Sequence, residues 1–274
     1  MKAGTRCAAA LLAVGALVAL SPAVPARAAN LRDVKEKVFH FAPGGDIVIE
    51  STNGRIGVEA WDRDEVRVQI TREVRAADDD QARQLMRELK ADVTVNPDEI
   101  HIESIYPKKQ KVVGLWDLIG HGVRSVNIHY YLQVPRRTSL DLNTTNGAIR
   151  VRAVEGKVAV ATTNGDVDVS QVKGSLSAHT TNGEVRLARI EGPADAETTN
   201  GSVAVELASL PPQGRMQMET TNGNIALTLP RELHADVAAE TTNGRVNINY
   251  KLATQGSISS KSIRGTVGGG GVRI

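Results

Sequence analysis

A four-residue motif that recurs at a fixed interval is the strongest constraint on how this chain of 274 residues can fold. Thr-Thr-Asn-Gly occurs six times, and a Ser-Thr-Asn-Gly variant lies well before the first copy. The first four copies are 18 residues apart, and the next two intervals are 22 and 21 residues. The copies begin at Thr144, Thr162, Thr180, Thr198, Thr220 and Thr241, and the variant begins at Ser51. A fixed period is typical of architectures in which each repeat supplies one structural unit.

Apolar residues alternate between these motifs, and further glycines fall at half the period, so a turn is expected every nine residues. Asn-Gly between such strands is compatible with an antiparallel meander of hairpins or with a solenoid. Two features favour the solenoid. The alternation breaks on every second strand, as in Val151 followed by Val154. The motif also recurs at 18 residues rather than nine, and identical side chains gain most when coils stack about 4.8 Å apart.

We therefore predict an all-β fold, a two-sheet β-solenoid (β-roll or β-helix) of about 18-residue coils over residues 138–274. The first threonine of each motif should point inward and the second outward. The asparagines should form a structural ladder along one corner and not a ligand site. They are Asn146, Asn164, Asn182, Asn200, Asn222 and Asn243. A glycine run at 268–271, followed by three last residues, is expected to close the C-terminal end.

Residues 29–137 are predicted to form a small N-terminal α+β cap that contains one outlying coil at 46–58. Residues 65–74 alternate as a strand, and Asp78 to Asp80 offer a helix N-cap. Apolar residues then follow at helical spacing, and 93–95, 100–102 and 126–134 supply further strands. Such a cap would keep one end of the sheets from pairing with another molecule.

Residues 1–28 have the organisation of a signal peptide, with Lys2 and Arg6 before a short apolar run and Ala26-Arg27-Ala28 at the expected cleavage site. We expect an exported protein, in the periplasm, on the cell surface or secreted, with no transmembrane segment. Cleavage would also remove the only cysteine, Cys7. It would change 33 basic and 31 acidic residues to 30 and 31, which lacks the positive excess of a nucleic-acid-binding protein.

Several segments of the sequence resemble the bacterial putative adhesin domain family, a group of exported β-solenoid proteins whose function is largely unassigned. They are Asp46 to Gly54, Ala60 to Val66, Tyr131 to Pro135, the Thr-Asn-Gly repeat and the closing glycine-rich turn. The resemblance covers most of residues 38–274. It implies an extracytoplasmic repeat fold, association with the envelope and no catalytic residues to transfer.

The residues indicate no enzyme, cofactor or metal site. The six histidines lack the spacing of metal ligands and no nucleophile motif is present. The corners carry neutral asparagine where calcium-binding β-rolls carry aspartate. We interpret the chain as a non-catalytic, adhesin-like envelope module for binding or structure, and we expect a monomer. Two alternatives stay open: an enzyme acting on envelope polysaccharide, and a self-assembling envelope scaffold.

Two surface features are candidate binding sites for an unidentified envelope glycan or envelope protein. Glu197, Glu219 and Glu240 are expected to stack on one sheet beside the outward threonines, with His179 one coil earlier. Their like charges call for an offset, by a bound cation, by nearby Arg215 or Lys251, or by solvent. A basic, Trp-bearing segment contributes Lys108, Lys109, Lys111, Trp116 and Leu118. The favoured alternative is that Leu115, Trp116, Leu118 and Ile119 of this segment plug the open end of the first coil, because exposed aliphatic patches are unusual on monomeric proteins.

Overall fold

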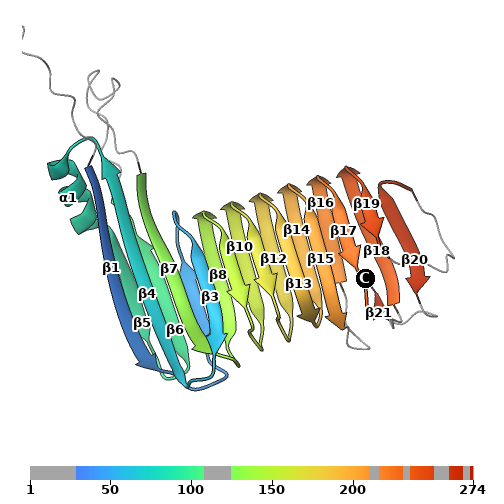
Figure 1. Ribbon diagram of the computed structural model, residues 1–274, viewed down its shortest axis with the longest axis horizontal. Coiled ribbons are helices and arrows are strands. Elements are labelled where there is room, and N and C mark those ends of the chain that lie inside the picture. Colours follow the sequence, from blue (N-terminus) through green and yellow to red (C-terminus); the bar gives the residue numbers. More distant parts are fainter. Residues whose placement is uncertain are drawn as a thin grey trace, which may run out of the picture.

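Two facing β-sheets run the length of the molecule in this computed structural model, which describes residues 29–107, 125–209, 216–230, 235–249, 259–267 and 272–273 (Figure 1). The strands of one sheet are, in spatial order, β1 (Ala29–His40), β4 (Glu65–Ala76), β7 (Ser125–Pro135), β3 (Ile56–Trp61), β9 (Ile149–Arg152), β11 (Val167–Ser170), β13 (Val185–Glu191), β15 (Val203–Ser209), β17 (Ile225–Thr228) and β19 (Val246–Ile248). We call this ten-stranded layer sheet A.

The second layer, sheet B, runs in the order β20 (Ser262–Val267), β18 (Ala235–Asn243), β16 (Met216–Asn222), β14 (Ala194–Asn200), β12 (Leu176–Asn182), β10 (Val158–Asn164), β8 (Ser139–Asn146), β2 (Asp46–Glu50), β6 (Glu99–Ile105) and β5 (Lys90–Val95). A short strand, β21 (Val272–Arg273), also pairs with β18. The one helix of the described residues is α1 (Asp79–Glu88).

From β8 onward the chain alternates between the two sheets, and each strand pairs in parallel with the strand one coil away. Thr162 faces Thr144 on one side and Thr180 on the other, so the register follows the 18-residue period. No antiparallel hairpin forms at these Asn-Gly pairs. The predicted two-sheet β-solenoid is confirmed.

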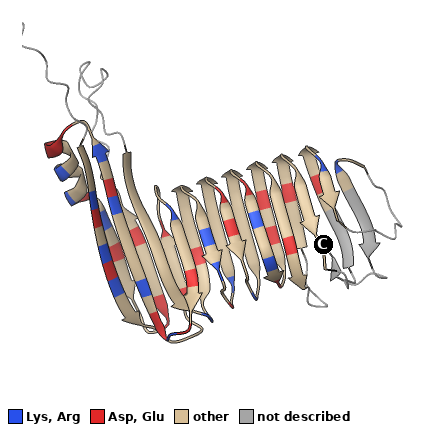
Figure 2. Ribbon diagram, in the orientation of Figure 1, with Lys and Arg blue, Asp and Glu red and all other residues tan. Residues whose placement is uncertain are grey.

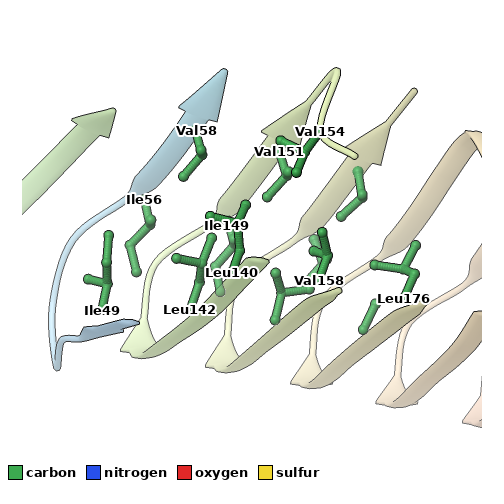
Figure 3. Close-up of a cluster of buried hydrophobic side chains, with 14 of the residues drawn as sticks. Ile49, Ile56, Val58, Leu140, Leu142, Ile149, Val151, Val154, Val158 and Leu176 are labelled. Atoms are coloured by element: carbon green, nitrogen blue, oxygen red, sulfur yellow. The ribbon is translucent and has the colours of Figure 1, made fainter. Parts of the chain in front are cut away.

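The core is a continuous layer of aliphatic side chains between the sheets (Figure 3). Ile49 and Leu142 of sheet B point toward Ile56 and Val58 of sheet A. The breaks in alternation have a backbone cause. Ala153, Gln171 and Arg189 have positive φ values of 60°, 57° and 56°, and each turns the chain so that the next residue enters the core. The residues that enter are the buried Val154, Val172 and Ile190.

The first threonine of each motif is buried and the second is exposed, as the alternation predicts. The buried hydroxyl has a partner that the sequence did not reveal, because it donates to the carbonyl oxygen of the motif glycine one coil earlier. Thr162, Thr180 and Thr198 bond in this way to Gly147, Gly165 and Gly183, each at 3.0 Å. A buried polar group is thus satisfied at every coil.

The motif glycine allows neighbouring coils to approach at this corner. A Cβ atom on Gly183 would lie 2.0 Å from the carbonyl oxygen of Gly165, and one on Gly201 would lie 1.9 Å from that of Gly183. Both obstacles are backbone atoms, which cannot rotate away. Any side chain here would therefore push two coils apart.

The outlying coil stacks directly beneath the repeats. Strand β2 pairs with β8, β3 pairs with β9, and Asn53 bridges Asn146. The chain then leaves the stack through β4, α1 and β5 and returns as β6 and β7, which pair in parallel with β2 and β3 on their other edges. Residues 99–105 and 125–135 thus lie one layer below residues 46–61, although they follow them in sequence.

The rest of the N-terminal region closes this end of the stack. Strands β4 and β1 extend sheet A in antiparallel fashion, and β5 does so in sheet B. Helix α1 is capped by Asp78, which accepts a hydrogen bond from the Gln81 amide, and it packs against β4 and β1 with Ala82 buried. The predicted helix and strands of this region are confirmed. No described helix is long and apolar enough to cross a membrane.

The two outer edges carry protective features. Edge strand β1 has charged residues on both faces, and Figure 2 shows dense basic and acidic positions on β1 and β4. At the other end, β20 reverses direction and pairs antiparallel with β18. The predicted closing coil was expected at 268–274. Of it, only Val272 and Arg273 are described, and they pair with Ala235 and Asp236.

We predict that Gly183→Ala destabilises the fold by about 2–4 kcal/mol, since its Cβ would collide with backbone of the previous coil. Gly57→Ala is the matched control. It also lies in the stack, but its Cβ would meet Tyr131 Cδ2 at 3.4 Å and the Tyr130 carbonyl oxygen at 3.8 Å, both ordinary contact distances. Its effect should stay within about 0.5 kcal/mol. Urea unfolding of both variants measures the difference, and equal losses would show that coil contact does not set the glycine requirement.

Candidate functional site

The outward threonines and the acidic row share the exposed face of sheet B. Thr181, Thr199 and Thr221 point to solvent, and Glu197 and Glu219 do so two positions earlier on their strands. Strand pairing places Glu197 beside Glu219 and Glu219 beside Glu240. The face is therefore a flat array in which hydroxyls and carboxylates repeat at the strand spacing, about 4.8 Å.

The acidic row begins with a hydrogen-bonded group of three side chains. His179 Nδ1 lies 3.3 Å from Glu197 Oε2, and His179 Nε2 lies 2.7 Å from Ser177 Oγ. In the neutral ring that donates from Nδ1, Nε2 accepts from the serine hydroxyl. Glu197 therefore has a partner, whereas no ion pair involves Glu219 or Glu240 within the part of the chain that the structure describes.

The hydrogen bonds link Ser177 to His179 and His179 to Glu197, which is the connection expected for a nucleophile, a general base and an orienting acid. Sequence reasoning missed the group because Ser177 shows no nucleophile motif, although the 18-residue period does place Glu197 beside His179. The arrangement lies on an open strand face. The surrounding backbone amides are used in the sheet ladder, so no pair of them points at a reacting oxygen above Ser177.

The acidic row continues toward the N-terminal region after an interruption. Asn143, Ala161 and His179 separate the three glutamates from Glu50, which pairs with Asn143 in register. Glu103 and Asp92 follow beyond Glu50. The carboxylates thus form two exposed groups on one face, one at each end of the stack.

The predicted asparagine ladder runs along the corner beside this face. Each side-chain amide donates to the side-chain oxygen of the asparagine one coil earlier, at 2.7–2.9 Å, from Asn243 back to Asn53. Amide groups aligned head to tail polarise one another. The donors and acceptors are therefore engaged within the ladder, which leaves it a structural element that fixes the spacing of the threonines.

A hydroxyl network ends the ladder at its N-terminal side. Tyr106 Oη accepts from the Asn53 amide at 2.8 Å and donates to the Asn53 carbonyl at 2.6 Å. Its hydroxyl also contacts Ser51 Oγ at 3.1 Å, and Ser104 links Ser51 to Tyr130. Burial raises the pKa of Tyr130 well above its usual range, which keeps this phenol neutral.

The outer face of sheet A carries charge of both signs, as Figure 2 shows for the visible side of the stack. Arg150, Asp168 and Arg186 lie in register on successive strands, so the charges of this column alternate in sign. Arg150 forms an ion pair with Asp168 at 3.4 Å. Arg186 instead forms an ion pair with Glu184, which lies just before β13. These exposed pairs contribute about 0–1 kcal/mol each and serve the fold.

The remaining predicted residues lie outside the described part of the chain. They are Lys108, Lys109, Lys111, Trp116 and Leu118, together with the candidate counter-charges Arg215 and Lys251. The described residues contain no group of three or more histidines, cysteines or acids placed to hold a metal ion. The acidic row is spread along the sheet at strand spacing and does not converge on one point.

A family model described as Toastrack DUF4097 matches residues 136–213 and 175–274, which together span 139 of the 274 residues. The chain belongs to the Toastrack DUF4097 family. Its repeats and their closing strands carry the match, as the sequence resemblance implied. No curated protein matches the chain.

A comparison with solved structures finds matches at low sequence identity and low TM-score. A putative adhesin from Bacteroides fragilis is 13% identical, with a TM-score of 0.36, over 79% of this chain and 96% of that one. A putative cell adhesion protein from Clostridium sporogenes is 8% identical, with a TM-score of 0.30, over 79% and 99%. A putative lipid binding protein from Parabacteroides distasonis is 11% identical, with a TM-score of 0.30, over 79% and 88%.

We predict that Glu219→Gln raises the midpoint of thermal unfolding at low salt by about 1–2 °C, because it relieves repulsion from both neighbours. Added salt should shrink the gain. Glu197→Gln is the matched control, since it removes the partner of His179 and should bring no gain. If calcium instead stabilises the unmodified chain and Glu219→Gln abolishes that effect, the row holds a cation and repulsion is not its main property.

Proposed function

We propose that this protein is an exported, non-catalytic binding module of the cell envelope, whose working surface is the exposed face of sheet B together with the 107–125 segment. The observation that carries the proposal is the fixed array of outward threonines and glutamates. Residues 1–28 supply the signal for export, and the described part of the chain offers no enclosed reaction site. A monomer suits the charged edge strand β1 and the reversed strand β20 at the two ends.

A rigid row of identical groups suits a partner that is itself extended or repetitive. The backbone ladders hold the coils at one spacing, so hydroxyls and carboxylates keep their register when a partner arrives. Little ordering entropy is then lost by this side of the interface. A polyhydroxylated glycan, or an elongated protein with exposed cationic groups, would meet acceptors and donors at regular intervals.

The proposal predicts that changing Glu197, Glu219 and Glu240 together to Gln weakens binding to envelope material. Co-sedimentation with purified, insoluble cell-wall glycan and recovery of envelope proteins would both be measured. A second variant combines Trp116→Ala with Leu118→Ser and removes two apolar side chains of the 107–125 segment. Each variant should lose at least about tenfold in affinity if its residues anchor the partner.

The matched control changes three exposed acids of α1, Asp79→Asn, Asp80→Asn and Glu88→Gln, which alters the net charge equally away from sheet B. This control should bind as the unmodified chain does. Unchanged recovery by both folded test variants contradicts the proposed surface. Release of soluble sugar from the glycan in the same incubation contradicts the non-catalytic part of the proposal.

A further inference from the structure

A hollow on the outer face of sheet A, opposite the proposed working surface, is built around a strand residue without a side chain. Gly57 of β3 faces Tyr131 of β7 on one side and Arg150 of β9 on the other. The missing side chain leaves a gap between these two neighbours. The hollow is lined by Arg55, Gly57, Glu59, Tyr131, Arg150 and Arg152, together with Ile56, Val58, Tyr130 and Ala148.

Tyr131 forms one wall of the hollow and is held at both ends. An ideal Cβ on Gly57 would lie 3.4 Å from Tyr131 Cδ2, so the ring begins beside the glycine. The Tyr131 hydroxyl donates to Glu59 Oε2 at 2.8 Å, two residues further along β3. The ring therefore extends along β3, yet 41% of the residue is exposed. Desolvation and the nearby Glu59 raise the pKa of Tyr131, so it remains a neutral phenol.

Three arginines, Arg55, Arg150 and Arg152, line the same hollow as this ring. Arg150 forms an ion pair with Asp168, with Nε and Oδ2 3.4 Å apart, and the Arg150 side chain is 62% exposed. Neither Arg55 nor Arg152 forms an ion pair with another described residue. The one acid of the lining, Glu59, is engaged by Tyr131. The lining carries three positive charges and one negative charge, so it favours an anion.

The strand corner that carries Arg55 is fixed by a histidine. The Arg55 backbone amide donates to His129 Nδ1 at 3.0 Å, which joins the start of β3 to β7. Burial lowers the pKa of His129, and the neutral ring can accept this bond. Arg55 is thereby kept at one end of the hollow while Arg152 lies on the neighbouring strand beside Glu59.

We propose that this hollow binds an acidic sugar residue of an envelope polysaccharide, with the sugar ring against Tyr131 and its carboxylate on Arg152 and Arg55 or Arg150. An exposed, fixed aromatic ring offers an apolar surface with a polar tip, which suits the mixed faces of a pyranose. Guanidinium groups match a carboxylate in charge and in planar geometry. The inference rests on the proposed envelope-binding function and adds a second site that selects for negative charge.

Other anions are less well matched to this lining. A phospholipid headgroup would satisfy the arginines, but the aliphatic residues Ile56 and Val58 of the lining are buried and leave no apolar trough for an acyl chain. A free phosphate would use the arginines and not the ring. The involvement of Tyr131 is thus the property that separates a sugar acid from a simple anion.

The test is a calorimetric titration of the full chain with a soluble oligogalacturonate, with its neutral methyl ester as the paired ligand and with inorganic phosphate as a third. The acid form should bind at least about tenfold more tightly than either of the others. Arg152→Gln, Tyr131→Leu and the space-filling Gly57→Val should each lower the affinity by about tenfold or more. Arg186→Gln, an arginine of the same face outside the hollow, should leave it unchanged.

Equal binding of the acid and its ester, or undiminished binding by folded Arg152→Gln and Tyr131→Leu variants, overturns the proposal. Phosphate binding as tight as that of the oligosaccharide shows a simple anion site and overturns it as well. The outcome is separable from that of the proposed function. Variants of the hollow can lose binding of the acidic oligosaccharide while the sheet B face still binds envelope material. Conversely, variants of the sheet B face can lose binding of envelope material while the hollow still binds the acidic oligosaccharide.

Discussion

The whole stack depends on the close approach of backbones at the Asn-Gly corner. At Gly147, Gly165, Gly183, Gly201, Gly223 and Gly244, an added Cβ would lie 1.7–2.2 Å from the glycine carbonyl oxygen of the preceding coil. That carbonyl also accepts the buried threonine hydroxyl of the following coil. The three residue types of the motif therefore act together. Glycine lets the backbones of neighbouring coils approach, threonine donates to the glycine carbonyl oxygen, and asparagine links the side chains of successive coils.

This constraint also shapes the surfaces. Because the coils keep a single spacing, every outward position becomes a row along the sheet, and its chemistry depends on what each repeat places there. On sheet B the rows carry hydroxyls and carboxylates. On sheet A, glycine at 57 interrupts a row and opens a hollow beside Tyr131. Both proposed sites are therefore formed by outward-facing positions of the stacked strands and require no separate scaffold.

The sequence was sufficient to predict the repeat fold because the period, the parity and the corner residues all pointed to the same arrangement. The inward and outward threonines followed from alternation alone. Strand β1 was not predicted, since Lys35, Glu36 and Lys37 are all exposed and leave no period-2 pattern. The threading of β6 and β7 beneath β2 and β3 was not predicted either, because local patterns do not specify which strands pair out of order.

The candidate sites were also only partly predictable from the sequence. The neighbours of Glu197, Glu219 and Glu240 could be predicted from the period. The role of Ser177 depends instead on a side-chain contact within its own strand, and the Tyr131 hollow depends on contacts between neighbouring strands. Tyr131 and Gly57 are 74 residues apart in sequence, and only the register of β3 with β7 brings them together. No spacing rule in the sequence connects them.

The central claim, parallel stacking at the repeat period, is tested most directly by a disulfide between outward threonines one coil apart. In a Cys7→Ser chain, Thr163→Cys with Thr181→Cys places the two Cα atoms at the strand spacing of about 4.8 Å, within disulfide range. We expect oxidation to join them without loss of the fold. The pair Thr163→Cys with Thr199→Cys spans two coils, about 9.6 Å, and should stay reduced. An antiparallel meander would also place residues 163 and 181 about 9.6 Å apart, so failure of the first pair to bridge would contradict the solenoid.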